Sequence, residues 1–308
     1  MSTTDVPLEV RGVTKRYGRR TILDELDFTV NPGTITGFLG PNGAGKSTTM
    51  RIMMGLDRPT SGQALITGVP IASLPAPGHV VGAVLSNRCA HPGRSVIDSL
   101  RWAAKLLDVP ESACWEQLER VDLVAAARLP TKHLSLGMRQ RLALAIALLG
   151  NPQIMLLDEP MNGLDPPGIT WLRELLLDLR ANGHTILLAS HLLREIEDLV
   201  DDLVVVVDGR IVESGSMADF RENFRDQAVT VGCDDVQRLV AEATQRGGQV
   251  RGELRGDRVT LVGLSAKELG HIARGADITI EEMVTESGLE RVFEAATRNS
   301  RATTGNHT

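Results

Sequence analysis

Residues 40–48 read Gly40-Pro41-Asn42-Gly43-Ala44-Gly45-Lys46-Ser47-Thr48 and fit the pattern G-x-x-x-x-G-K-[ST]. In this pattern, backbone N–H groups surround phosphate oxygens, the lysine reaches the terminal phosphates, and the hydroxyl residue binds Mg²⁺. The apolar residues 35–39 predict a strand before the loop, and residues 47–54 predict a helix whose N-terminus faces the phosphates. A glycine-rich turn without a ligand is the alternative. Because strand, loop, lysine and helix follow one another in register, we predict a nucleotide-binding loop.

An acidic pair follows a second apolar run. The four apolar residues 154–157 are typical of a strand buried on both faces of a parallel sheet, and Asp158 and Glu159 come directly after them. Ligands bind outside the carboxyl ends of such strands. We therefore expect Asp158 to hold Mg²⁺, directly or through water, and Glu159 to act as the general base near the terminal phosphate. An ordinary solvated acidic turn is the alternative, and the nearby phosphate loop makes it less favoured.

A third segment, Leu134-Ser135-Leu136-Gly137-Met138-Arg139-Gln140, resembles the LSGGQ-type signature of ATP-binding cassette (ABC) ATPases. Leu136 departs from the usual glycine at the third position. Gly137 allows a close backbone approach, and Ser135 with the following helix can present a hydroxyl and N–H groups to a phosphate. Taken alone, the segment could equally be the start of a core helix, since apolar residues recur at helical spacing up to residue 149.

The resemblance implies roles for further residues. Tyr17, the only tyrosine, resembles the aromatic residue that stacks on adenine. His191, after the apolar run 185–189, resembles the histidine that hydrogen-bonds the γ-phosphate. The family also implies a head-to-tail pair of copies around ATP and Mg²⁺. One copy would supply Lys46, Ser47, Asp158, Glu159 and His191, of which Lys46, Glu159 and His191 act in catalysis. The other would supply Ser135, Gly137, Gln140 and Asp165 in trans.

One family position is different in this chain. ABC ATPases usually carry a glutamine, sometimes an acid, at the strand end that follows residues 81–85, where it touches Mg²⁺ or the attacking water; Ser86 stands there. A serine side chain is shorter and uncharged, so it would need a bridging water, or Asn87 would have to take over. Slow hydrolysis or altered coupling is the expected consequence.

Composition places limits on partners and compartment. The 308 residues carry a net charge of −6 without blocks of basic residues, so we expect no nucleic-acid partner. No apolar run reaches the roughly 18 to 20 residues of a membrane span, and the first residues lack a signal-peptide layout. Cys89, Cys114 and Cys233 lack metal-ligand spacing and read as free thiols. We expect a cytoplasmic protein, peripheral on the cytoplasmic face of the membrane.

The chain divides into segments of different pattern. Residues 1–222 hold all the motifs, and the resemblance implies an α/β P-loop NTPase domain with a mixed sheet, an antiparallel edge sheet and a helical insert at about 95–149. Residues 223–296 show a βαββαβ order that suggests a small ferredoxin-like α+β domain, with a last helix at 289–296. Residues 297–308 form a polar tail that we expect to be disordered.

Two functions remain open at this point. The first is the ATP-hydrolysing subunit of a bacterial ABC transporter that powers transport, by resemblance export of drugs, peptides or lipids, through a separate membrane permease. The second is a nontransport ABC ATPase that regulates a cytosolic or nucleic-acid partner. Only 112 positions separate Lys46 from Asp158, which leaves no room for the long coiled coils of chromosome-associated relatives.

Overall fold

The computed structural model describes residues 7–86, 89–223, 228–251 and 256–286. The chain forms two compact units, Met1–Met217 and Ala218–Thr308. The division falls at the start of α7 (Met217–Asn223), whereas the sequence places the boundary after residue 222. Among the described residues, no helix has both the length and the apolar character that crossing a membrane requires.

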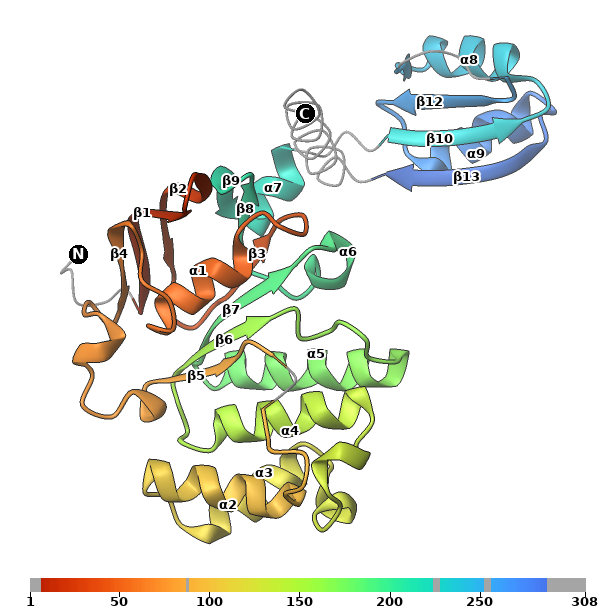
Figure 1. The fold of residues 1–308 in the computed structure, drawn as a ribbon. Helices are drawn as coiled ribbons and strands as arrows, with labels where there is room; N and C mark the ends of the chain where they lie inside the picture. Colours follow the sequence, from red (N-terminus) through yellow and green to blue (C-terminus); the bar gives the residue numbers. More distant parts are fainter. Residues whose placement is uncertain (1–6, 87–88, 224–227, 252–255, 287–308) are drawn as a thin grey trace. The chain divides into compact units, whose positions relative to one another are not determined.

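A six-stranded mixed sheet forms the centre of the first unit (Figure 1). Its strands, in spatial order, are β5 (Val81–Val84), β6 (Ile154–Asp158), β7 (Thr185–Ser190), β3 (Ile35–Leu39), β8 (Asp202–Val207) and β9 (Arg210–Ser216). The first five run parallel and β9 pairs antiparallel with β8. Every residue of β3 and β7 is buried, which explains why these strands read as continuous apolar runs.

A separate antiparallel sheet has the order β2-β1-β4, with β1 (Leu8–Tyr17), β2 (Arg20–Val30) and β4 (Ser61–Ile66). The edge sheet is the predicted one, and β1 and β2 are long strands of 10 and 11 residues. Register shifts interrupt the pairing of β1 with β2, and Gly12 lies within one of them with φ 53°. Such bulges break the two-residue alternation on which the prediction depends.

Helices cover the sheet and build the insert. They are α1 (Lys46–Met53), α2 (Val96–Leu107), α3 (Glu111–Arg120), α4 (Leu136–Leu148), α5 (Pro166–Ala181) and α6 (Leu193–Ile196). Short 3₁₀ turns lie at Ile71–Ser73, Pro77–His79, Val124–Ala126 and Thr131–His133. The second insert helix starts at Glu111, directly after Pro110, because the fixed φ of proline is compatible with a helix start.

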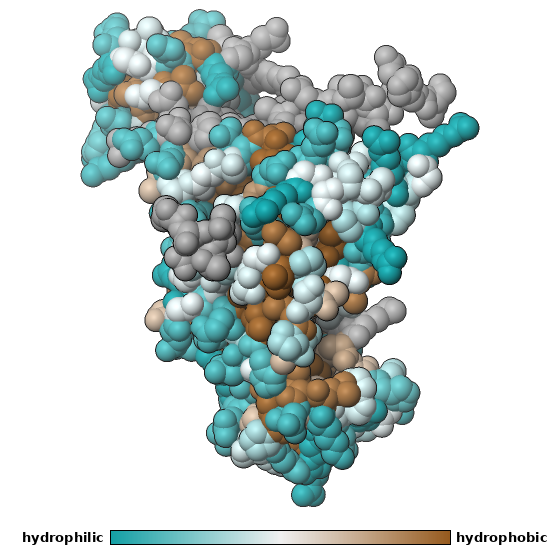
Figure 2. All heavy atoms as spheres, turned by 90° about the vertical axis from the view of Figure 1, so that its left-hand side faces the viewer, coloured by the Kyte–Doolittle hydropathy of each residue, from teal (hydrophilic) through white to brown (hydrophobic). Residues whose placement is uncertain are grey.

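The insert has its own apolar core, in which α2, α3 and α4 pack together. Large apolar side chains also remain exposed on it, among them Trp102 and Leu106 on α2. Figure 2 shows a similar mixture on one face of the molecule, where hydrophilic side chains dominate and apolar residues gather along the middle. This face is therefore polar with apolar areas, which is normal for a globular protein.

The second unit contains β10 (Ala228–Cys233), α8 (Val236–Gln245), β11 (Gln249–Val250), β12 (Arg258–Val262), α9 (Ala266–Gly275) and β13 (Ile280–Glu286). This βαββαβ order is the expected one, and the strands pair antiparallel in the order β11-β12-β10-β13. The helices and one face of the sheet enclose an apolar core. The predicted helix at 289–296 and the tail 297–308 lie outside the described residues.

Candidate active site

The glycine-rich loop connects β3 to α1, as predicted. Gly43 and Gly45 adopt φ angles of 86° and 106°, in the region that favours glycine. A Cβ atom at Gly45 would lie 2.3 Å from Leu23 Cδ2, and one at Gly40 would lie 2.4 Å from the Val206 carbonyl oxygen. The loop therefore needs glycine for two reasons, its backbone conformation and its close contact with β2 and β8.

Lys46 is the first residue of α1 and its side chain is only 5% exposed. Its Nζ donates to the Gly40 carbonyl oxygen at 2.6 Å and lies 3.2 Å from Glu159 Oε1. Ser47 follows on the exposed side of the helix start. The ammonium group of Lys46 is thus held inside the loop, at the N-terminus of a helix that leaves its first N–H groups without a side-chain cap.

The two acidic residues lie at the carboxyl end of β6, next to the loop. Glu159 has φ 49°, an uncommon backbone conformation for a residue with a side chain, and its N–H donates to the Ala189 carbonyl oxygen at 3.1 Å. This conformation places Glu159 Oε2 2.8 Å from His191 Nδ1. Glu159 therefore lies between the cation of Lys46 and the imidazole of His191, and its role as the general base stays a prediction.

Asp158 is suited to a metal ion. Burial raises the pKa of its carboxyl group, while a hydrogen bond from Ser47 and the charge of Lys46 act in the opposite direction. Its Oδ1 atom is buried without a hydrogen-bond partner among the described residues. A buried carboxylate oxygen of this kind needs a cation or a donor. The described residues contain no group of three or more His, Cys, Asp or Glu side chains that could hold a metal ion.

A pocket of about 340 Å³ opens beside these carboxylates. Its lining comes from four parts of the chain: Leu85, Ser86, Leu136, Gln140, Asp158, Glu159 and Asn162. Ser86 therefore reaches the site, as the strand end of β5 predicts. Gln140 lies there too, 5% exposed and next to the acidic pair of its own chain. The expected contact of Gln140 in trans stays a prediction.

Ser135 and Gly137 are placed differently from Gln140. The exposed Ser135 caps α4, with its Oγ accepting from the Met138 N–H at 3.2 Å. A serine hydroxyl that accepts in this way keeps its own hydrogen for a further acceptor. Gly137 is partly exposed in the first turn of the same helix. Both residues remain available to a phosphate that approaches from outside the chain.

The loop after the acidic pair packs on the signature segment within one chain. Gly163 has φ 75°, and a Cβ atom there would lie 2.2 Å from Leu136 Cδ2. Asp165 caps α5 by accepting from the Gly168 N–H at 3.1 Å. The local role of Asp165 is thus to start a helix. Its side chain is exposed, so a contact in trans stays a prediction.

Tyr17 lies at the end of β1 and is 51% exposed. Its hydroxyl donates to Asp57 Oδ2, which raises the pKa of the phenol, and Lys15 Nζ lies 2.5 Å from Asp57 Oδ1. The same ammonium group lies 4.6 Å from the centre of the Tyr17 ring, over one of its faces. The stacking of adenine on this ring stays a prediction. The sequence analysis did not predict that Asp57 contacts Tyr17. Lys15 lies two residues before Tyr17 on the same face of the strand, and this cation could have indicated a nearby acidic partner.

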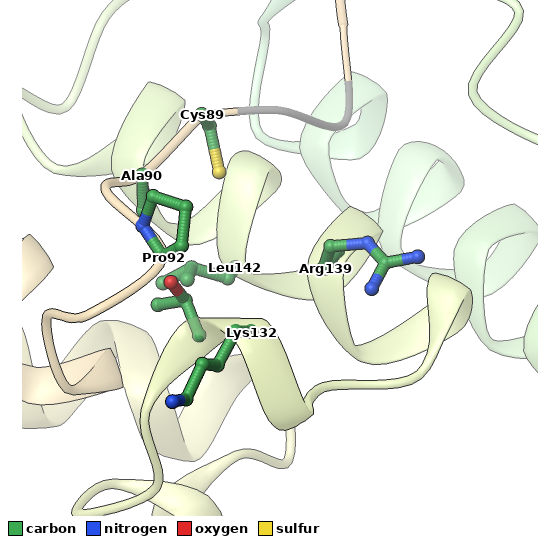
Figure 3. A pocket seen from close by; sticks show the side chains of 7 residues that line it. Cys89, Ala90, Pro92, Lys132, Arg139 and Leu142 are labelled. Carbon is green, nitrogen blue, oxygen red and sulfur yellow. The ribbon is translucent and has the colours of Figure 1, made fainter.

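A larger pocket of about 670 Å³ lies between residues 89–92, the turn Thr131–His133 and α4 (Figure 3). Cys89, Lys132 and Arg139 are among its lining residues. Cys89 is exposed as a residue, but its sulfur points into the pocket, where burial of the thiol raises its pKa to about 11. The side chains of the acidic pair do not line this pocket, so it is distinct from the site of hydrolysis.

Comparison with known proteins agrees with this geometry. The ABC transporter family profile matches residues 23–162, from β2 to the loop after the acidic pair. The lantibiotic transport ATP-binding protein SrtF of Streptococcus pyogenes is 37% identical over 205 residues, which cover 67% of this chain and 89% of the relative. The chain belongs to the ABC transporter family. It is an ATP-binding protein of that family and an ATPase.

Two further comparisons support this assignment. The Nod factor export ATP-binding protein I of Cupriavidus metallidurans is 37% identical over 235 residues, or 75% of this chain and 76% of the relative. A solved structure described as the ATP-binding subunit of an ABC transporter superposes with a TM-score of 0.64 at 29% identity, covering 70% of this chain and 92% of the other. The expected family and fold class are therefore confirmed.

Proposed function

We propose that this ABC ATPase works as a pair of copies that hydrolyse Mg²⁺-ATP and power export through a separate membrane permease. The observation that carries the chemical part is the position of Glu159 between Lys46 and His191, at 3.2 and 2.8 Å, beside the phosphate loop. The loop residues 40–48 hold the phosphates, and Tyr17 offers one ring face to adenine. Ser47 and Asp158 hold Mg²⁺, which withdraws charge from the phosphate oxygens when bound.

Hydrolysis in this site needs one base and one attacking water. Glu159 accepts a proton from the water, whose oxygen forms a bond to the γ-phosphorus. The bond from that phosphorus to the bridging oxygen breaks, and ADP leaves with the electron pair. Lys46 and His191 face the oxygens of the transferred group and offset their charge.

A γ-phosphate would compete with two partners of Lys46. Its ammonium group is shared between the Gly40 carbonyl oxygen and Glu159. A γ-phosphate carries more charge than either partner and would take over this cation. Glu159 would then be released from Lys46 and could turn to the water, so binding of the nucleotide would prepare the base.

The second copy supplies what a single chain lacks. Ser135 keeps a hydroxyl hydrogen and Gly137 allows close approach, but neither lines the pocket beside the acidic pair. In a head-to-tail pair, both would close over the γ-phosphate bound to the other copy. ATP then binds the closed pair more tightly than the open one, and hydrolysis removes this difference in affinity.

The role in export rests on the relatives. Proteins named for lantibiotic transport and for Nod factor export share 37% of aligned residues with this chain. We infer that the chain lies on the cytoplasmic face of the membrane, bound to a permease that provides the path. Affinity purification of the tagged chain from its native membranes tests this. A co-purified multi-span membrane protein that changes the ATPase rate is the expected result, and recovery with only cytosolic proteins or nucleic acid would contradict it.

A further inference from the structure

Gln140 carries a buried amide without a partner. The side chain is 5% exposed, and its Nε2 atom makes no hydrogen bond to any part of the chain that the structure describes. Leaving a buried donor unpaired costs about 1 to 3 kcal/mol. A site that keeps such a donor therefore indicates a ligand or a bound water.

The amide belongs to the wall of the pocket that also holds the acidic pair. Asp158 Oδ1 and Glu159 Oε1 are buried there and, like Gln140 Nε2, lack a hydrogen-bond partner within the described ranges. Glu159 Oε1 is near Lys46 Nζ, at 3.2 Å, but without hydrogen-bond alignment. One donor and two acceptors are thus buried in residues that line the same pocket of about 340 Å³, which has room for several waters at roughly 30 Å³ each.

One water between these groups would satisfy the unpaired atoms. An amide N–H donates to the water oxygen, and the water donates its hydrogens to carboxylates. This polarity is the one that hydrolysis requires, because it points a proton of the water at the base and leaves an oxygen lone pair for the phosphorus. An amide on the buried part of α4 is also well fixed, since α4 packs against α2 and α3.

We propose that Gln140 is a water-positioning residue, whose Nε2 holds the attacking water against Glu159 of the same chain. The proposal rests on the function proposed above, in which Glu159 is the base. Ser86 lines the same pocket from the end of β5. A longer amide side chain at position 86 would therefore enter the same space from another wall.

The test compares Gln140→Leu with Gln117→Leu in the full-length chain. Gln117, on α3, also has a buried side-chain atom without a partner, its Oε1, but it does not line the pocket. We expect Gln140→Leu to lower kcat about 10- to 100-fold, as for a misplaced reactant, with the Kd for ATP unchanged within about twofold. Gln117→Leu should retain the wild-type kcat. If both variants or neither lose turnover, the proposal is overturned.

Rescue separates positioning from packing. Ser86→Gln should raise the wild-type rate only modestly and leave ATP binding intact, but in the Gln140→Leu background it should recover most of the lost kcat. A double variant no faster than Gln140→Leu would contradict the proposal. If Gln140→Leu does not fold, Gln140→Met, which keeps the length of the side chain without the amide, replaces it with the same expected results.

Glu159→Gln, measured in the same ATPase assay, distinguishes a failure of the proposed function from a failure of the role proposed for Gln140. Persistent turnover in Glu159→Gln would remove Glu159 as the base and overturn the function on which this inference rests. Loss of turnover in Glu159→Gln together with the wild-type rate in Gln140→Leu would overturn only the role of Gln140.

Discussion

Gly137 lies against Leu164 of the same chain with space for one more carbon atom. A Cβ atom added at Gly137 would lie 3.5 Å from Leu164 Cδ2, an ordinary van der Waals distance, and Gly137 is not in the left-handed region. The fold of a single chain thus does not require glycine at this position. A phosphate approached by the backbone of α4 from a second copy would require it.

Gly137→Ala therefore tests the contact between copies. We expect the melting temperature and ATP binding of the single chain to be unchanged, and turnover to fall at least tenfold, because the methyl group holds the backbone away from the phosphate. Thermal unfolding, nucleotide titration and a steady-state ATPase assay measure the three quantities. Gly163→Ala is the control for a glycine that the fold needs, since its Cβ would lie 2.2 Å from Leu136 Cδ2. Wild-type turnover in Gly137→Ala would contradict the assignment.

Gly45→Ala should destabilise the phosphate loop. The left-handed φ of 106° costs a residue with a side chain about 1 to 2 kcal/mol, and Leu23 must also move from a contact of 2.3 Å. Gly43→Ala is the matched control, because φ is 86° there and an added Cβ meets nothing within 4 Å. Without nucleotide, we expect the melting temperature to fall further for Gly45→Ala than for Gly43→Ala. Equal melting temperatures would show that the contact with Leu23 is unimportant.

Tyr17→Ala should weaken ATP binding by about 1 to 3 kcal/mol, the range for stacking of a base on an aromatic ring. Tyr17→Phe keeps the ring and removes the hydroxyl that donates to Asp57, so a smaller loss is expected. Calorimetric titration with ATP measures both. Because stacking tolerates any base, GTP should lose a similar amount of affinity. Unchanged ATP affinity in Tyr17→Ala would remove this residue from the site.

Cys89 should react slowly with alkylating reagents at neutral pH. The pKa of its thiol is raised to about 11 by burial, and only the thiolate is nucleophilic. At pH 8, about one thiol in a thousand is then ionised, against roughly a quarter for an ordinary cysteine with a pKa of about 8.5. Its alkylation rate, followed by peptide mass spectrometry, should rise about tenfold per pH unit from pH 8 to 10. A plateau below pH 9 would contradict the raised pKa.

The sequence predicted the fold best where a motif residue stands directly next to an apolar strand. The strand Ile35–Leu39 has the predicted bounds, and the strand that ends at Asp158 was recognised because a buried parallel strand is apolar throughout. The order of elements in the second unit was also recognisable from alternating periods of two and 3.6 residues. These signals are local, so no knowledge of distant contacts was needed.

Other features depend on contacts between distant residues. The strand order of the central sheet, with β3 between β7 and β8, does not follow from local pattern. Gln140 lies on α4, and only the folded chain shows that it lines the same pocket as Asp158 and Glu159. Asp57 lies 40 positions from Tyr17 in the sequence and looks like any surface acid until β1 and the segment before β4 meet.

The central claim is that ATP joins two copies of this chain, each of which completes the site of the other. Glu159→Gln removes the base and keeps the shape, so ATP should bind without being turned over. With saturating ATP and Mg²⁺, light scattering should show twice the mass of a single chain, and a second substitution, Lys46→Ala, should abolish this shift. A Glu159→Gln protein that binds ATP and Mg²⁺ and still has the mass of one chain would contradict the account.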